Sequence, residues 1–189
     1  EFGVSPIPET RRRMIERGLS PEQLRATAMS LGGGSGWVVV ALSPLTNDLR
    51  IVGSAGRRQL DAEAFFQGPY TTALEPTEML EAVEFPDGAG TEAVVMEHAR
   101  RHGDFAVVSV AATGLPGLGG SWRWIRIGLG AVADRPRYAR RASEGLAGTR
   151  LGPTDVEAAA ARCLEEAEPA SDVRASAEYR RHLIPILVE

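Results

Sequence analysis

The chain contains no lysine: all 21 of its basic residues are arginine. This absence excludes catalysis through a lysine Schiff base and the binding of phosphate by a lysine clamp. Cysteine is almost missing as well, since Cys163 is the single one. One cysteine forms no internal disulfide and builds no cysteine-rich metal or iron–sulfur site.

Long apolar runs are also missing. The longest unbroken one, Trp37 to Leu42, is far shorter than the roughly 20 residues that a membrane-spanning helix needs. No secretory signal pattern opens the sequence, so we expect a cytoplasmic protein that does not enter a membrane. The net charge of −4 excludes general nucleic-acid binding, for which a basic surface is required.

What the chain does have is an ordinary globular composition, with 43% apolar and 24% charged residues in a length of 189. This size fits one domain, or one domain with a smaller subdomain. Residues 92–133 hold three β-branched or aromatic runs separated by glycine-rich turns, which predicts an antiparallel three-stranded sheet. The rest of the chain after this sheet has helical periodicity. The expected fold is therefore α+β: a three-stranded antiparallel sheet packed with a C-terminal helical bundle, preceded by a small helix and strand subdomain.

Local signals predict the remaining elements. The expected strands cover residues 37–42, 48–52, 57–60 and 79–85. A single helical turn is expected after the N-cap Asp61, with irregular chain over 67–74. The expected C-terminal helices are one over 137–147, one opened by a capping box at Thr154, and one capped by Asp172.

Four segments resemble the flavin-carrying medium subunit of molybdenum hydroxylases, the group that contains carbon monoxide dehydrogenase and xanthine dehydrogenase. They occur in the same order as in that family. The segments are Ala64–Leu80 (AFFQGPYTTALEPTEML), Arg100–Ala106 (RRHGDFA), Gly130–Pro136 (GAVADRP) and Ser171–Leu183 (SDVRASAEYRRHL).

The resemblance implies two parts. Residues 1–72 would be a truncated remnant of the flavin-binding domain, and residues 73–189 a domain like the C-terminal one of the carbon monoxide dehydrogenase flavoprotein. It also implies FAD as cofactor. In the family, two glycine-rich loops hold the FAD pyrophosphate through backbone N–H groups; here the first loop is absent, and only Ser30-Leu31-Gly32-Gly33 remains of the second.

This resemblance and the strand pattern also indicate candidate residues for contact with the flavin or another ligand. The segment around Asp104 matches one that lies near the flavin ring in the family, although a polar turn with Asp104 bonding the local backbone is the simpler interpretation. Trp122 and Trp124 are two apart on a strand, so alternation predicts that they share one face with Arg126. With Tyr70 at its rim, that face would suit a planar ligand or a partner protein.

Histidine offers no metal site. His98 and His102 are four residues apart, but they fall on the end of an expected strand and its turn, where they do not share a helix face. No catalytic triad can be proposed from sequence order alone.

Three functions remain open. The chain would be a truncated medium-subunit homologue that works in electron transfer with molybdenum and iron–sulfur subunits, or with a separate chain that carries the flavin domain. Alternatively, it would be a stand-alone module without cofactor that binds a small apolar molecule in the cleft between its subdomains, as a cyclase, isomerase or lyase of a biosynthetic pathway. The third possibility is a structural interaction subunit.

Overall fold

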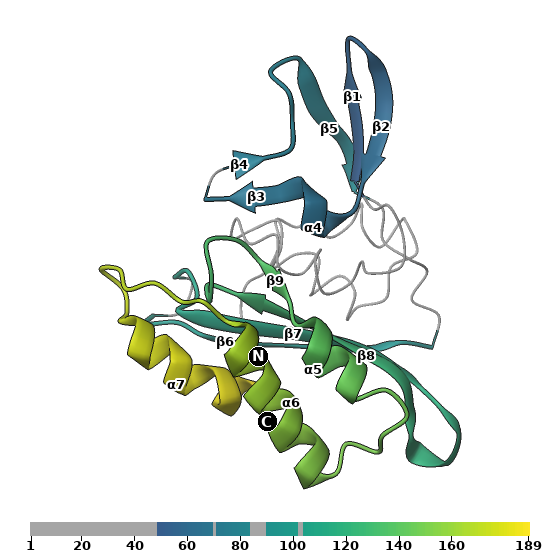
Figure 1. Ribbon diagram of the computed structural model, residues 1–189, viewed down its shortest axis with the longest axis vertical. Coiled ribbons are helices and arrows are strands. Elements are labelled where there is room, and N and C mark those ends of the chain that lie inside the picture. Colours follow the sequence, from purple (N-terminus) through teal and green to yellow (C-terminus); the bar gives the residue numbers. More distant parts are fainter. Residues whose placement is uncertain (1–48, 70, 84–89, 102–103) are drawn as a thin grey trace.

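The computed structural model describes residues 49–69, 71–83, 90–101 and 104–189. Within these residues the fold is α+β, as expected, and consists of a small β-rich unit followed by a larger unit of sheet and helices (Figure 1). The strand expected at 37–42 and the segment Ser30-Leu31-Gly32-Gly33 lie outside the described residues.

The first unit is a three-stranded antiparallel sheet in the order β2-β1-β5, with a short helix and a small hairpin beside it. Its elements are β1 (Leu49–Gly53), β2 (Gly56–Leu60), α4 (Ala62–Phe65), β3 (Phe66–Gly68), β4 (Thr71–Thr72) and β5 (Glu78–Val83). Strand β5 pairs with β1, so this sheet draws on residues from both sides of the boundary expected at residue 72.

Helix α4 begins as its sequence predicts. The Asp61 carboxylate accepts a hydrogen bond from the backbone N–H of Ala64, which satisfies one of the free donors at the helix start. Residues 67–74 were expected to be irregular, but they include the β3–β4 hairpin. That expectation was wrong because strands of two or three residues are too short to produce a detectable alternation.

The second unit contains the predicted meander in residues 92–133. The sheet order is β6-β7-β8-β9 and all pairs are antiparallel. The three helices lie on one side of this sheet (Figure 1). The elements are β6 (Glu92–His98), β7 (Val108–Pro116), the 3-10 turn η1 (Leu118–Gly120), β8 (Trp122–Gly130), β9 (Arg137–Tyr138), α5 (Arg140–Gly145), α6 (Pro153–Glu166) and α7 (Ala177–Val188).

Three details of this unit correct the sequence-based expectations. The helix expected over 137–147 starts only at Arg140, because residues 137 and 138 pair with β8 and add a fourth strand. Helix α6 begins at Pro153 rather than after Thr154, and the Asp155 carboxylate accepts from the Gly152 N–H at 3.0 Å. The N-cap of α7 is Ser176, whose hydroxyl accepts from Tyr179, and not Asp172.

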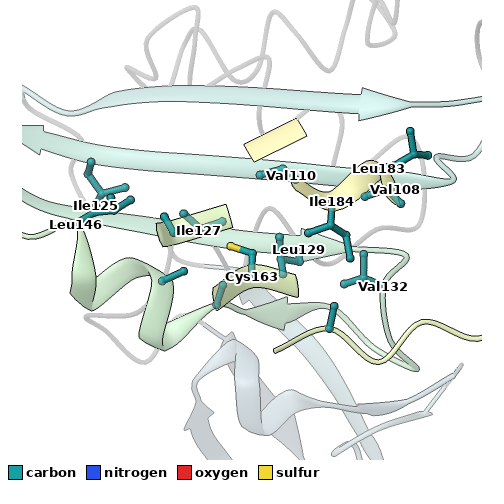
Figure 2. Close-up of a cluster of buried hydrophobic side chains, with 14 of the residues drawn as sticks. Val108, Val110, Ile125, Ile127, Leu129, Val132, Leu146, Cys163, Leu183 and Ile184 are labelled. Atoms are coloured by element: carbon teal, nitrogen blue, oxygen red, sulfur yellow. The ribbon is translucent and has the colours of Figure 1, made fainter. Parts of the chain in front are cut away.

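The main core lies between the sheet and the helices. Strand side chains such as Leu129 meet Cys163 of α6 and Ile184 of α7, and all three are fully buried (Figure 2). Ala159 and Ala160 let α6 approach the neighbouring elements closely, since alanine adds little bulk. Burial of this apolar surface fixes the three helices on one face of the sheet.

The two units contact each other around β9. Tyr138 packs against the core of the first unit, the Arg135 guanidinium donates to the Phe66 carbonyl at 3.0 Å, and Arg140 forms a 2.9 Å ion pair with Glu63. The short fourth strand and the residues on either side of it therefore join the first unit to the second.

Candidate functional site

A cavity of about 330 Å³, partly open to solvent, lies on the helix side of the second sheet. It lies where β6 and β8 begin and β7 ends, beneath the α5–α6 connection and the end of α7. We call it the Trp122 cavity. Its lining consists of Glu92, Ala93, Val94, Ala112, Thr113, Gly114, Trp122, Ile125, Ile127, Leu146, Leu151, Val156, Ala159, Val188 and Glu189.

Trp122 reaches this cavity because of a β-bulge. In the β7–β8 ladder Pro116 is opposite Trp122 and Leu115 is opposite Trp124, which leaves Arg123 without a cross-strand partner. An extra residue shifts the alternation of side chains by one position. As a result, Trp122 lies on the same face as Ile125 and packs against the main core.

Two hydrogen bonds of the Trp122 backbone also fix the position of this residue. Its N–H donates to the Thr149 carbonyl at 2.8 Å, and its carbonyl accepts from the Gly148 N–H at 2.6 Å. The indole ring lies directly over Gly114, where a Cβ atom would be only 2.7 Å from ring atom Cε3. The absence of a side chain at Gly114 is therefore what makes room for the ring.

The opposite face of the sheet carries Trp124 and Arg126. The Arg126 guanidinium lies 4.5 Å from the centre of a Trp124 ring, which is cation–π geometry, and Arg126 is buried. The expectation that Trp122, Trp124 and Arg126 share one face was therefore wrong for Trp122, because the bulge at Arg123 interrupts the alternation. Tyr70, expected at the rim, lies outside the described residues.

Asp104 has a local structural contact. Its carboxylate accepts from the N–H of Phe105 at 2.8 Å, and its own N–H donates to the Arg101 carbonyl. These are the bonds of a polar turn. The neighbouring Phe105 is 56% exposed and has the Arg174 guanidinium stacked 4.5 Å from its ring centre.

The beginning of α7 is tied to the end of β6. The Tyr179 hydroxyl and His98 Nε2 are 3.1 Å apart, and their rings meet edge to face. Among the described residues, no group of three or more His, Cys, Asp or Glu side chains has the arrangement of a metal site. No helix in the described ranges is both long and apolar enough to cross a membrane.

At the starts of α6 and α7, backbone N–H groups that could contribute to a cradle for the pyrophosphate of FAD are already bonded within the chain. Such a cradle needs free N–H groups at a helix start or in a glycine loop. At α6, the Gly152 N–H is bonded by Asp155; at α7, the Ala177 and Tyr179 N–H groups are bonded by the hydroxyls of Ser171 and Ser176. These donors already have partners within the chain.

The architecture defines an α+β protein whose second unit is an antiparallel meander covered on one face by three helices. The chain belongs to the carbon monoxide dehydrogenase flavoprotein family: residues 93–189 match the model of the CO dehydrogenase flavoprotein C-terminal domain. This match covers the second sheet and all three helices packed on it, from the first residues of β6 to the end of α7.

Curated relatives and a solved structure agree with this assignment. The chain is 30% identical over 148 residues to the glyceraldehyde dehydrogenase medium chain of Sulfolobus acidocaldarius, which covers 78% of this chain and 52% of that one. It is 34% identical over 139 residues to the carbon monoxide dehydrogenase medium chain of Afipia carboxidovorans, covering 73% and 48%. The fold also resembles the carbon monoxide dehydrogenase from Hydrogenophaga pseudoflava that lacks the Mo-pyranopterin moiety of its cofactor, with a TM-score of 0.74 at 28% identity, over 97% of this chain and 67% of the other.

The chain thus spans about half the length of the curated relatives that it matches. It is a homologue of the medium subunits of these hydroxylase and dehydrogenase complexes. The resemblance noted in the sequence is confirmed by the family match, and two of its four segments, Gly130–Pro136 and Ser171–Leu183, lie entirely within the described part of the second unit.

Proposed function

We propose that this chain forms the C-terminal body of a flavoprotein medium subunit and takes part in electron transfer by docking onto a part that holds FAD. The observation that carries the proposal is the family match over the whole second unit, from β6 to α7. Molybdenum and iron–sulfur subunits are the further partners in this proposal.

In this role the chain's own residues position and support the part that holds FAD. They do not perform redox chemistry. FAD, when bound to the assembly, supplies the electron transfer. Backbone N–H groups at the starts of α6 and α7 already have partners, so we propose that FAD is held mainly by another chain, with the segment that contains Ser30-Leu31-Gly32-Gly33 as a minor contributor. The two phosphate charges need several convergent donors, which that other chain would supply.

A docking surface for the flavin-holding part is proposed at Phe105 and Arg174. Aromatic residues, including phenylalanine, and arginine are both enriched at protein–protein interfaces, and here an exposed ring lies under an arginine. Val173 beside them is 95% exposed and extends the apolar surface. The expectation that the segment around Asp104 lies near the flavin ring, as in the family that it resembles, supports the choice of this surface.

Co-expression tests the proposal. The part of the Hydrogenophaga pseudoflava medium chain that this protein does not match is expressed alone and together with this chain, and FAD released by denaturation is counted per chain. We expect this chain alone to carry little FAD, and the co-expressed pair to elute together with FAD bound. Failure of the pair to associate, or FAD bound fully by this chain alone, would contradict the proposal.

A matched pair of variants locates the docking surface. Phe105→Ser should weaken co-elution, because it removes the exposed ring. Leu118→Ser is the control, since Leu118 is 95% exposed on the turn between β7 and β8 and loses a comparable apolar surface. If both variants co-elute as well as the unchanged chain, the assembly forms without the Phe105 surface.

A further inference from the structure

We propose that the Trp122 cavity is a binding site for a small organic cation: a molecule with an apolar body and an amino group that is protonated at neutral pH. This site is separate from the proposed electron-transfer role. It lies inside the second unit, on the helix side of its sheet, and differs from the cleft between subdomains that the sequence suggested.

The size of the cavity argues for a ligand. The cavity is partly open to solvent beside β6, where Val94 is 55% exposed, so a ligand can enter it. Its volume of about 330 Å³ is at the lower end of the range observed for small-molecule pockets. It is too small to receive a helix or strand of a partner protein.

The walls are preformed. Trp122 is fixed by two backbone hydrogen bonds to the α5–α6 connection and by the contact of its ring with Gly114. Leu151, which also lines the cavity, has a left-handed backbone with φ of 54°, which is unusual for a branched residue. An aromatic wall on a rigid strand needs no ordering when a ligand binds, so little affinity is lost to conformational entropy.

Two glutamates in the lining of the cavity favour a positively charged ligand. Glu92 on β6 and Glu189 after α7 are the charged residues of the described lining, and every other side chain there is apolar apart from Thr113. Thr113 lies on a strand between Ala112 and Gly114, so alternation directs its side chain to the other face of the sheet. Both glutamates are exposed, and either carboxylate attracts an ammonium group and repels a carboxylate or phosphate.

Three probes of nearly the same shape test the charge preference: 4-phenylbutylamine, 4-phenylbutanol and 4-phenylbutyrate, each titrated into the full chain by calorimetry at the same ionic strength. We expect the amine to bind with a dissociation constant on the order of 0.1 mM, in line with the affinity per atom of small ligands. The alcohol should bind about fivefold more weakly, and the carboxylate more weakly again, as expected for partly exposed charge pairs.

Variants identify the site. Glu92→Gln should weaken amine binding roughly threefold without changing alcohol binding, because a single partly exposed charge pair is lost. Glu97→Gln is the matched control: it lies on the same strand but on the opposite face, outside the lining. Ala112→Leu should abolish binding of all three probes by filling the cavity, and Ala159→Met serves the same purpose from α6 if the first variant does not fold.

The proposal is overturned if none of the probes binds, if the carboxylate binds as tightly as the amine, or if a folded filling variant binds the amine unchanged. Equal losses in the Glu92→Gln and Glu97→Gln variants would also contradict it, since they would show a general effect of surface charge.

Discussion

The Arg180 guanidinium and the Asp172 carboxylate form an ion pair of 2.7 Å that joins α7 to the loop preceding it. Arg180 is 5% exposed, and its Nη1 also donates to the backbone carbonyls of Val107 and Ala131. These carbonyls lie just before β7 and just after β8. One side chain therefore connects the last helix to the ends of two central strands.

Arg180→Met should lower the free energy of unfolding by about 2–4 kcal/mol, because two backbone carbonyls and one carboxylate lose a charged donor. Urea denaturation followed by circular dichroism measures the change. Arg181→Met is the control, since Arg181 is exposed on the same helix and should have little effect. Equal stability of the two variants would show that the buried contacts of Arg180 contribute nothing net.

A steric prediction concerns Gly114. Gly114→Ala should cost about 1–3 kcal/mol of stability, because the new Cβ would lie 2.7 Å from the Trp122 ring and the ring is tied to its position. Gly152→Ala is a matched control, since a Cβ there would meet its nearest neighbour, an Asp155 oxygen, at an ordinary 3.6 Å. Combining Gly114→Ala with Trp122→Leu should remove most of the clash. The melting temperatures of all these variants test the prediction.

The ion pair of Glu78 with Arg58 should make the stability of the first unit sensitive to acid. The Arg58 guanidinium bonds both carboxylate oxygens of Glu78, and the Glu75 N–H adds a further bond, so the pKa of Glu78 is lowered to about 2. The folded pKa is below the unfolded value of about 4.3, so the stabilisation is complete above that value. It is lost as the pH falls from about 4.3 towards 2.

Carbon-13 NMR of the Glu78 carboxyl should therefore show a midpoint near 2. In acid denaturation, Glu78→Gln should lose stability at neutral pH and show a shallower decline below pH 4.3, which is roughly the unfolded pKa. Glu81→Gln is the control: the pKa of Glu81 is also lowered by its arginine partner Arg57, but Arg57 is largely exposed, so the effect should be smaller. An ordinary glutamate midpoint for Glu78 would contradict the prediction.

Cys163 provides a chemical probe of the core. Burial, with a smaller contribution from Glu166, raises the pKa of its thiol to about 12, and the side chain is fully buried. Because the thiolate is the reactive form, the folded chain should resist a thiol reagent at pH 8 and react fully in urea. Arg180→Met should raise the labelling rate by increasing the population of open states. Rapid labelling of the unchanged folded chain would contradict this.

Much of the fold could be predicted from local patterns. The strands that became β6, β7 and β8 are runs rich in β-branched residues, and Asp61 is followed by a turn of helix that its carboxylate can cap. These signals are contained within a few neighbouring residues. Strand β9 could not be predicted, because a pair of two residues with β8 depends on the position of the sheet and not on a pattern of its own.

The site was harder to predict because it depends on contacts distant in sequence. Asp172 has the residue type of an N-cap, but it closes a turn with Arg174 and Ala175 and pairs with Arg180 instead. The cavity combines residues from three strands, two helices and the connection between α5 and α6. Pro116, the last paired residue of β7, and Gly117 after it indicate that the ladder is irregular there, but they do not identify which residue is unpaired.

The unpaired residue Arg123 has a consequence beyond the local twist of its strand. Deleting it would make Trp122 and Trp124 neighbours in sequence, and ordinary alternation would then keep the two rings on opposite faces of a regular ladder. Two homologues that differ by this one codon would then keep the same architecture, and in both of them the first indole would face the helices.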